Sequence, residues 1–109
     1  MRRVLITGGS GFIGSYLAKA YMSDGYKVVV LDNLSTGKLK NLDNIIEEKN
    51  FSLQIGDVMD SYLVDNLVKN TDIVFHLAAA VGVKHVMSNP VDTIRINILG
   101  TENILHSCS

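Results

Sequence analysis

A glycine-rich loop that directly follows a short apolar run restricts the fold of this chain more than any other feature. Residues 4–6 read Val-Leu-Ile, and residues 7–14 read Thr-Gly-Gly-Ser-Gly-Phe-Ile-Gly. A buried strand that passes through spaced glycines into a helix forms a cradle for phosphate groups, because the N–H groups and the positive dipole end of the helix face the ligand. The loop therefore predicts a strand, a phosphate-binding turn and a helix, in that order.

Each glycine of the loop has a different expected role. Gly8 or Gly9 would permit the tight turn off the strand. Gly11 has no Cβ, so a pyrophosphate could approach its backbone closely, and Gly14 would let the helix pack against the strand. Glycine-rich turns are common, so this pattern needs a second observation before it indicates a ligand.

An acidic residue at the end of the next apolar run supplies that second observation. Asp32 follows residues 28–31, Val-Val-Val-Leu, and lies about 20 residues beyond the glycine loop. A carboxylate at this place can accept hydrogen bonds from both hydroxyls of an adenosine ribose. The alternative is a loop aspartate that caps a turn.

Composition limits the chain to one ordinary domain. The 109 residues allow a modest core, and ten basic against eleven acidic residues leave a net charge of −1. No strong field exists to attract nucleic acid or an anionic membrane, and no apolar stretch approaches the length of a membrane span. The one cysteine, Cys108, cannot form an internal disulfide, which favours a reducing cytoplasm.

Strand-like and helix-like patterns alternate along the chain. Short apolar segments rich in β-branched residues lie at 3–7, 27–32, 51–56 and 73–79. Because these segments are apolar on successive positions, they are typical of parallel strands that are covered on both faces. We expect an α/β, Rossmann-type doubly wound parallel sheet, with four strands in the order 3-2-1-4 and helices on both faces. The ligand crevice would then open at the carboxyl ends of the first and fourth strands.

The helical segments have expected buried faces and caps. The stripe of the first helix comprises Phe12, Ile13, Leu17, Ala20 and Tyr21. A second helix would begin after the N-cap Asp60, with the stripe Leu63, Val64, Leu67 and Val68. The last would have Asn89 as N-cap and Pro90 at its first position, with the stripe Val91, Ile94, Ile98 and Leu105. Residues 33–50 would hold a loop and one short helix around residues 39–47.

Five motifs, in order and with consistent spacing, carry a resemblance to a known family. They are the glycine loop at 7–14, Asp-Asn-Leu-Ser-Thr-Gly at 32–37, Gly-Asp-Val at 56–58, His-Leu-Ala-Ala at 76–79 and Asn-Ile-Leu-Gly-Thr at 97–101. At these positions the chain resembles the extended short-chain dehydrogenases/reductases, and among them the nucleotide-sugar epimerases and dehydratases, such as UDP-glucose 4-epimerase. The resemblance covers essentially the whole chain.

The resemblance implies NAD as the cofactor and a set of residues that would contact it. These residues are Gly8, Ser10, Gly11, Phe12, Ile13, Gly14, Asp32, Asn33, Leu34, Ser35, Thr36, Gly37, Asp57, Val58, Leu77, Ala78, Ala79 and Asn97. No arginine occupies positions 33–36 to pair with a 2′-phosphate, which favours NAD over NADP.

Several residues at or near the expected site allow two interpretations. Asp57 could accept from the adenine amino group or cap the following helix. His76, at an apolar strand end, reads as a core histidine bonded to backbone or as a catalytic base. Asn97 could bond the backbone behind an active site or be a buried structural amide. Lys84 and His85 could face phosphate or sugar, or lie in a solvated loop. No metal site is expected.

The chain lacks the catalytic residues that the resemblance implies. The family's chemistry uses a Ser or Thr and a Tyr-x-x-x-Lys pair, and none of Tyr16, Tyr21, Tyr26 and Tyr62 has a lysine four residues later. We therefore expect residues 1–109 to be the N-terminal part of a dinucleotide-binding Rossmann domain, without the catalytic and sugar-nucleotide-binding part. The fourth strand would then have an open edge, which favours self-association or a homodimer.

The expected function is the NAD-binding portion of a nucleotide-sugar 4-epimerase, in which hydride transfer at a hexose C4 is transient. The alternatives are a 4,6-dehydratase or decarboxylase of the same family, or a non-catalytic dinucleotide-binding module. The partner of the complete enzyme would be a nucleotide-sugar substrate.

Overall fold

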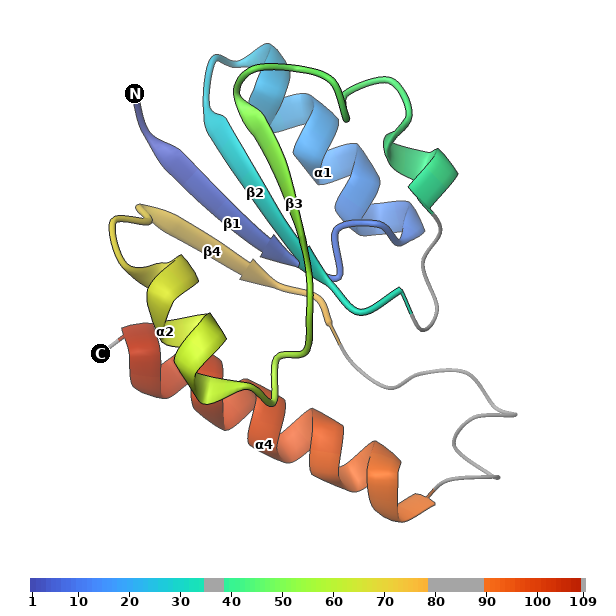
Figure 1. Cartoon of the computed structure of the whole chain (residues 1–109), viewed down its shortest axis with the longest axis vertical. Coiled ribbons are helices and arrows are strands. Elements are labelled where there is room, and N and C mark those ends of the chain that lie inside the picture. The colour runs from blue at the N-terminus through green and yellow to red at the C-terminus, as the bar shows by residue number, and fades with distance from the viewer. Residues whose placement is uncertain (35–38, 79–89, 109) are drawn as a thin grey trace.

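The computed structural model describes residues 1–34, 39–78 and 90–108, and in the last helix it describes side chains from residue 98 onward (Figure 1). The elements follow one another as β1 (Arg3–Thr7), α1 (Phe12–Ser23), β2 (Lys27–Asp32), the 3-10 helix η1 (Leu39–Leu42), β3 (Phe51–Ile55), α2 (Ser61–Val68), β4 (Ile73–His76) and α4 (Pro90–Cys108). This alternation confirms the expected α/β class.

The four strands form one parallel sheet in the order β3-β2-β1-β4, which confirms the predicted order. The chain moves outward from β1 to β3, returns across the sheet, and adds β4 on the other side of β1 (Figure 1). The strand order therefore reverses next to β1, where open α/β sheets place their ligand crevice.

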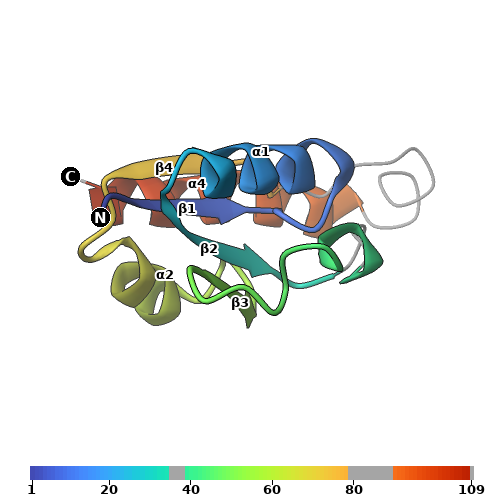
Figure 2. The same ribbon diagram turned by 90° about the horizontal axis from the view of Figure 1, so that it is seen from above.

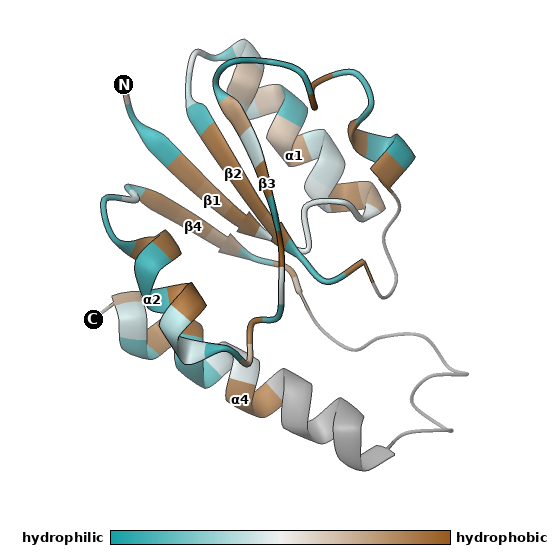
Figure 3. Ribbon diagram, viewed as in Figure 1, coloured by the Kyte–Doolittle hydropathy of each residue, from teal (hydrophilic) through white to brown (hydrophobic). Residues whose placement is uncertain are grey.

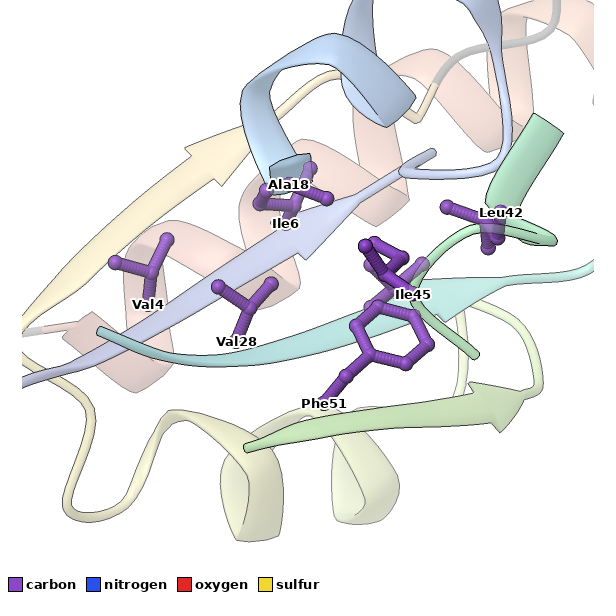
Figure 4. Close-up of a cluster of buried hydrophobic side chains, with 8 residues drawn as sticks. Val4, Ile6, Ala18, Val28, Leu42, Ile45 and Phe51 are labelled. Carbon is purple, nitrogen blue, oxygen red and sulfur yellow. The ribbon is translucent and has the colours of Figure 1, made fainter. Parts of the chain in front are cut away.

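Helices cover both faces of the sheet (Figure 2). On one face, side chains of β1 and β2 pack with Ala18 of α1 and with Leu42, Ile45 and Phe51 (Figure 4). On the other face, alternate side chains of the same strands pack with Val58, Val64 of α2 and Ile104 of α4. The two central strands are buried from both sides. They are also strongly hydrophobic, as the brown bands of Figure 3 show.

This burial makes β1 and β2 a rigid platform for whatever lies at their carboxyl ends. Residues 4–6 and 28–31 are at most 2% exposed. Complete burial of such an aliphatic side chain contributes about 1.5–3 kcal/mol. The loops that follow β1 and β2 therefore start from well-fixed positions.

The predicted buried stripe of α1 is wrong in part. Phe12, Ile13 and Ala20 are exposed, whereas Gly14, Ser15 and Ala18 are buried. Two of the predicted residues, Leu17 and Tyr21, do pack against the core. The helix lies so close to the glycine loop that small side chains face inward and the large side chains of its first turn point away.

The second helix follows its prediction. The Asp60 carboxylate accepts from the backbone N–H of Leu63 at 3.1 Å, which is an N-cap bond. Val64 is fully buried and Leu63, Leu67 and Val68 pack around it. The short helix predicted around 39–47 is a 3-10 turn at Leu39–Leu42 followed by further turns.

The last helix begins at Pro90 as predicted, but its predicted stripe is wrong where side chains are described. Ile98 and Leu105 are 60% and 65% exposed, whereas Gly100 and Ile104 are buried. A Cβ at Gly100 would lie 2.6 Å from Val58 Cγ2, so the helix approaches the turn after β3 through a glycine, while Ile104 packs against the sheet. Among the described residues, no helix has the length and apolar character needed to cross a membrane.

Candidate cofactor-binding site

The loop after β1 makes its tight turn at Gly8. This residue has φ +75°, and its N–H donates to the Leu31 carbonyl oxygen at 2.8 Å. A Cβ at Gly8 would lie 2.9 Å from the backbone nitrogen of Ala78. Glycine is therefore required both by the backbone conformation and by the end of β4. Of the two candidates for the turn, Gly8 is the one in the left-handed region.

The first turn of α1 faces open space. Gly11 is the N-cap, and within the described part of the chain no side chain forms a cap hydrogen bond with the N–H groups of the first turn. Among the described residues, a Cβ at Gly11 would meet the Gly8 carbonyl oxygen alone, at 3.4 Å. This combination of unpaired donors and free space suits an anion.

Gly14 has the opposite surroundings. A Cβ at this position would overlap the Gly8 carbonyl oxygen and lie 2.7 Å from Gly9 Cα. Gly14 was predicted to let the helix pack against the strand, whereas the close contact that it permits is between the helix and the glycine loop.

Asp32 joins the glycine loop to the end of β2. Its Oδ2 accepts from the Ser10 N–H at 2.9 Å and from the Ser10 hydroxyl, and its Oδ1 accepts from the Leu34 N–H at 2.7 Å. The side chain is 7% exposed. Asp32 therefore caps a turn and also fixes a negative charge beside the cradle.

Asn41 of η1 is a site residue that the sequence interpretation missed. Its Nδ2 donates to the Ser10 carbonyl oxygen at 2.8 Å, across 31 residues of sequence. The bond ties η1 to the glycine loop, while Leu42 next to it is fully buried. An isolated asparagine in a loop carries no signal of this kind in the sequence.

The carboxyl ends of β1 and β4 are joined by a hydrogen-bond network. The Thr7 hydroxyl lies 2.7 Å from His76 Nδ1 and accepts from the Ala78 N–H at 3.1 Å. His76 Nε2 lies 3.1 Å from the Thr101 hydroxyl of α4. Burial lowers the pKa of His76 below its ordinary value near 6.5, which favours the neutral ring. His76 is thus a structural histidine. Its partners are side-chain hydroxyls, whereas backbone partners were predicted.

A second acidic turn lies at the carboxyl end of β3. Asp57 Oδ1 accepts from the Met59 N–H at 2.9 Å, and Gly56 N–H donates to the Asp32 carbonyl oxygen at 3.1 Å. The turn therefore lies beside the end of β2. Asp57 does not cap α2, because Asp60 does.

The structure brings most of the predicted site residues to the end of the sheet where the carboxyl ends of the strands lie. Gly8, Ser10, Gly11, Phe12, Ile13, Gly14, Asp32, Asn33, Leu34, Asp57, Val58, Leu77 and Ala78 all lie in the loops after β1, β2, β3 and β4 or in the first turn of α1. The predictions for Ser35, Thr36, Gly37, Ala79, Lys84, His85 and Asn89 lie outside the described residues, as do those for the side chains of Val91, Ile94 and Asn97. Within the described part of the chain, no group of His, Cys, Asp and Glu could hold a metal ion.

Comparisons with known proteins agree with this geometry. A family model described as GDP-mannose 4,6 dehydratase matches residues 5–109. The chain belongs to this family, one of the extended short-chain dehydrogenases/reductases. The relatives of this chain are named for different reactions, and three of them serve as examples.

UDP-glucuronic acid decarboxylase 1 of Danio rerio is 38% identical over 95% of this chain. UDP-N-acetylglucosamine 4-epimerase of Methanobrevibacter ruminantium superposes with a TM-score of 0.88 at 36% identity over 98% of the chain. The dTDP-glucose 4,6-dehydratase of Streptomyces venezuelae, solved with NAD bound, has a TM-score of 0.88 at 28% identity over 96% of the chain. The chain spans 24%, 34% and 35% of these three proteins, respectively.

Proposed function

We propose that this chain is the NAD-binding portion of a nucleotide-sugar 4-epimerase. The observation that carries the proposal is the uncapped first turn of α1, which has free space at Gly11 and follows a loop bonded to Asp32 at the end of β2. The S. venezuelae relative with NAD bound supports the choice of cofactor.

The residues at the site fit the three parts of a dinucleotide. The N–H groups at the start of α1 would hold the pyrophosphate. A carboxylate has about four acceptor positions, and Ser10 and Leu34 use three of those of Asp32. The remaining position would accept from the adenosine ribose. Asp57 would accept from the adenine amino group through its second oxygen, for which the described residues supply no partner. Bound NAD supplies a hydride acceptor.

The same residues favour NAD over NADP. Asp32 is buried, charged and held by three donors, so it would repel a 2′-phosphate at the ribose. A titration of the chain with each dinucleotide tests this: we expect NADP to bind at least about tenfold more weakly than NAD. Equal binding of the two would refute the proposed role of Asp32.

The reaction itself is proposed from the resemblance, with the dehydratase and the decarboxylase as alternatives. Identity does not separate them, because the decarboxylase and the epimerase above are 38% and 36% identical to the chain. The proposed partner is a nucleotide sugar, and the proposed compartment is the cytoplasm, where a free exposed Cys108 stays reduced.

A chimera tests whether the chain serves catalysis. In the M. ruminantium epimerase, this chain would replace the segment that it matches. We expect the chimera to bind NAD and to interconvert the epimerase's substrate pair. A folded chimera that binds NAD without turnover would instead favour a non-catalytic dinucleotide-binding module.

A further inference from the structure

Helix α4 contacts the turn that follows β3. Asn103 Nδ2 donates to the Val58 carbonyl oxygen at 2.9 Å, across 45 residues of sequence. Gly100, three residues earlier on the same helix, leaves the room that Val58 fills, since a Cβ there would lie 2.6 Å from Val58 Cγ2. The helix thus fixes this turn by one hydrogen bond and one close apolar contact.

The Val58–Met59 peptide unit links Asn103 to Asp57. Its carbonyl oxygen accepts from Asn103, and its N–H donates to Asp57 Oδ1 at 2.9 Å. Donor, peptide and carboxylate therefore form one chain of hydrogen bonds through a rigid plane. Bonds in such a chain polarise one another, so the Asn103 amide strengthens the bond that orients the carboxylate.

We propose that Asn103 is a positioning residue that sets the adenine selectivity of the cofactor site, by orienting the Asp57 carboxylate through the Val58–Met59 peptide. The inference rests on the proposed NAD binding and adds the residue that governs adenine recognition. Asn103 itself lies behind the turn and does not contact the base. Its effect on binding is transmitted by the direction of one peptide plane.

The test compares NAD with its deaminated analogue, nicotinamide hypoxanthine dinucleotide, by calorimetric titration of the 109-residue chain. The analogue carries a carbonyl oxygen where adenine has an amino group, so its 6-position presents an acceptor to Asp57 and not a donor. We expect the wild-type chain to prefer NAD by about tenfold. In Asn103→Leu, which has a similar size but no donor, the preference should fall to about twofold to threefold.

Two controls separate positioning from general loosening. Glu102→Gln changes the exposed neighbour of Asn103 on the same helix and should keep the wild-type preference. In an Asp57→Ala background, Asn103→Leu should cause no further change in the preference, because the carboxylate through which it acts is gone. Asn103→Ala serves as a second variant if the leucine does not fit.

Three results of these titrations would contradict a proposal. A preference that stays near tenfold in folded Asn103→Leu or Asn103→Ala overturns the inference, whatever happens to the overall affinity. A wild-type chain that binds both dinucleotides equally overturns it as well. A wild-type chain that binds neither dinucleotide overturns the proposed function instead.

Discussion

Gly11 and Gly14 lie three residues apart, yet a methyl group at each would meet different surroundings. At Gly14 it would overlap the Gly8 carbonyl oxygen, a backbone atom that cannot move cheaply. Alanine favours a helix over glycine by about 1 kcal/mol, but such overpacking costs about 1–3 kcal/mol or more, so the clash decides. We expect Gly14→Ala to lower the free energy of unfolding, measured by urea denaturation.

Gly11→Ala is the matched control for that prediction. Gly11 has φ −72° and ψ 175°, which any residue adopts, and its Cβ would make one ordinary contact. We expect its free energy of unfolding to stay within about 1 kcal/mol of wild type. Equal losses in the two variants would show that the difference in surroundings does not matter.

His76 gives the stability of the fold a pH dependence. Because burial lowers its pKa in the folded state, the unfolded chain binds the proton more readily. The contribution of neutral His76 is complete above pH about 6.5 and is lost as the pH falls from there towards the lowered pKa. Urea denaturation between pH 7.5 and 5.5 should show a steeper loss for wild type than for His76→Asn. Parallel curves for the two proteins would contradict this.

At the scale of the elements, the approach of α4 to the sheet depends on the contact between Gly100 and Val58. Val58 is 4% exposed and β-branched, so it cannot turn away from a new Cβ. Gly100→Ala should therefore destabilise the wild-type fold by about 1 kcal/mol or more. In a Val58→Ala background the same substitution should be neutral or stabilising, because the space is free. Thermal melts of the four proteins check this change of sign, and the same loss in both backgrounds would refute it.

The strands and the buried face of α2 could be predicted from their apolar patterns, but the faces of α1 and α4 could not. Periodicity assumes that large apolar side chains point inward. On α1 and α4 the closest approach to the rest of the fold uses Gly14, Ala18 and Gly100, while Phe12 and Ile98 are exposed. The motifs predicted which residues lie at the site. Their partners, such as Asn41 and Asn103, form bonds across 31 and 45 residues that no local pattern reveals.

For the molecule as a whole, the free edge of β4 is the feature that predicts association. Among the described residues β4 pairs with β1 alone, and its four residues are each partly exposed (Figure 1). We expect the 109-residue chain to self-associate through this edge, since unpaired edges recruit other strands. Sedimentation velocity should show the association, and hydrogen exchange should slow at residues 73–76 as concentration rises. Slowing at residues 51–55 of the other edge strand instead, or none at all, would contradict it.

The central claim is that the start of α1 binds the pyrophosphate of NAD, and calorimetric titration of wild type and Gly11→Val tests it most directly. A Cβ at this position makes one ordinary contact, with the Gly8 carbonyl oxygen, so we expect the methyl groups of valine to occupy the space proposed for the pyrophosphate. We expect a measurable NAD affinity for wild type and none for Gly11→Val, with circular dichroism showing both proteins folded. Unchanged NAD affinity in folded Gly11→Val would contradict the cofactor assignment and the function proposed from it.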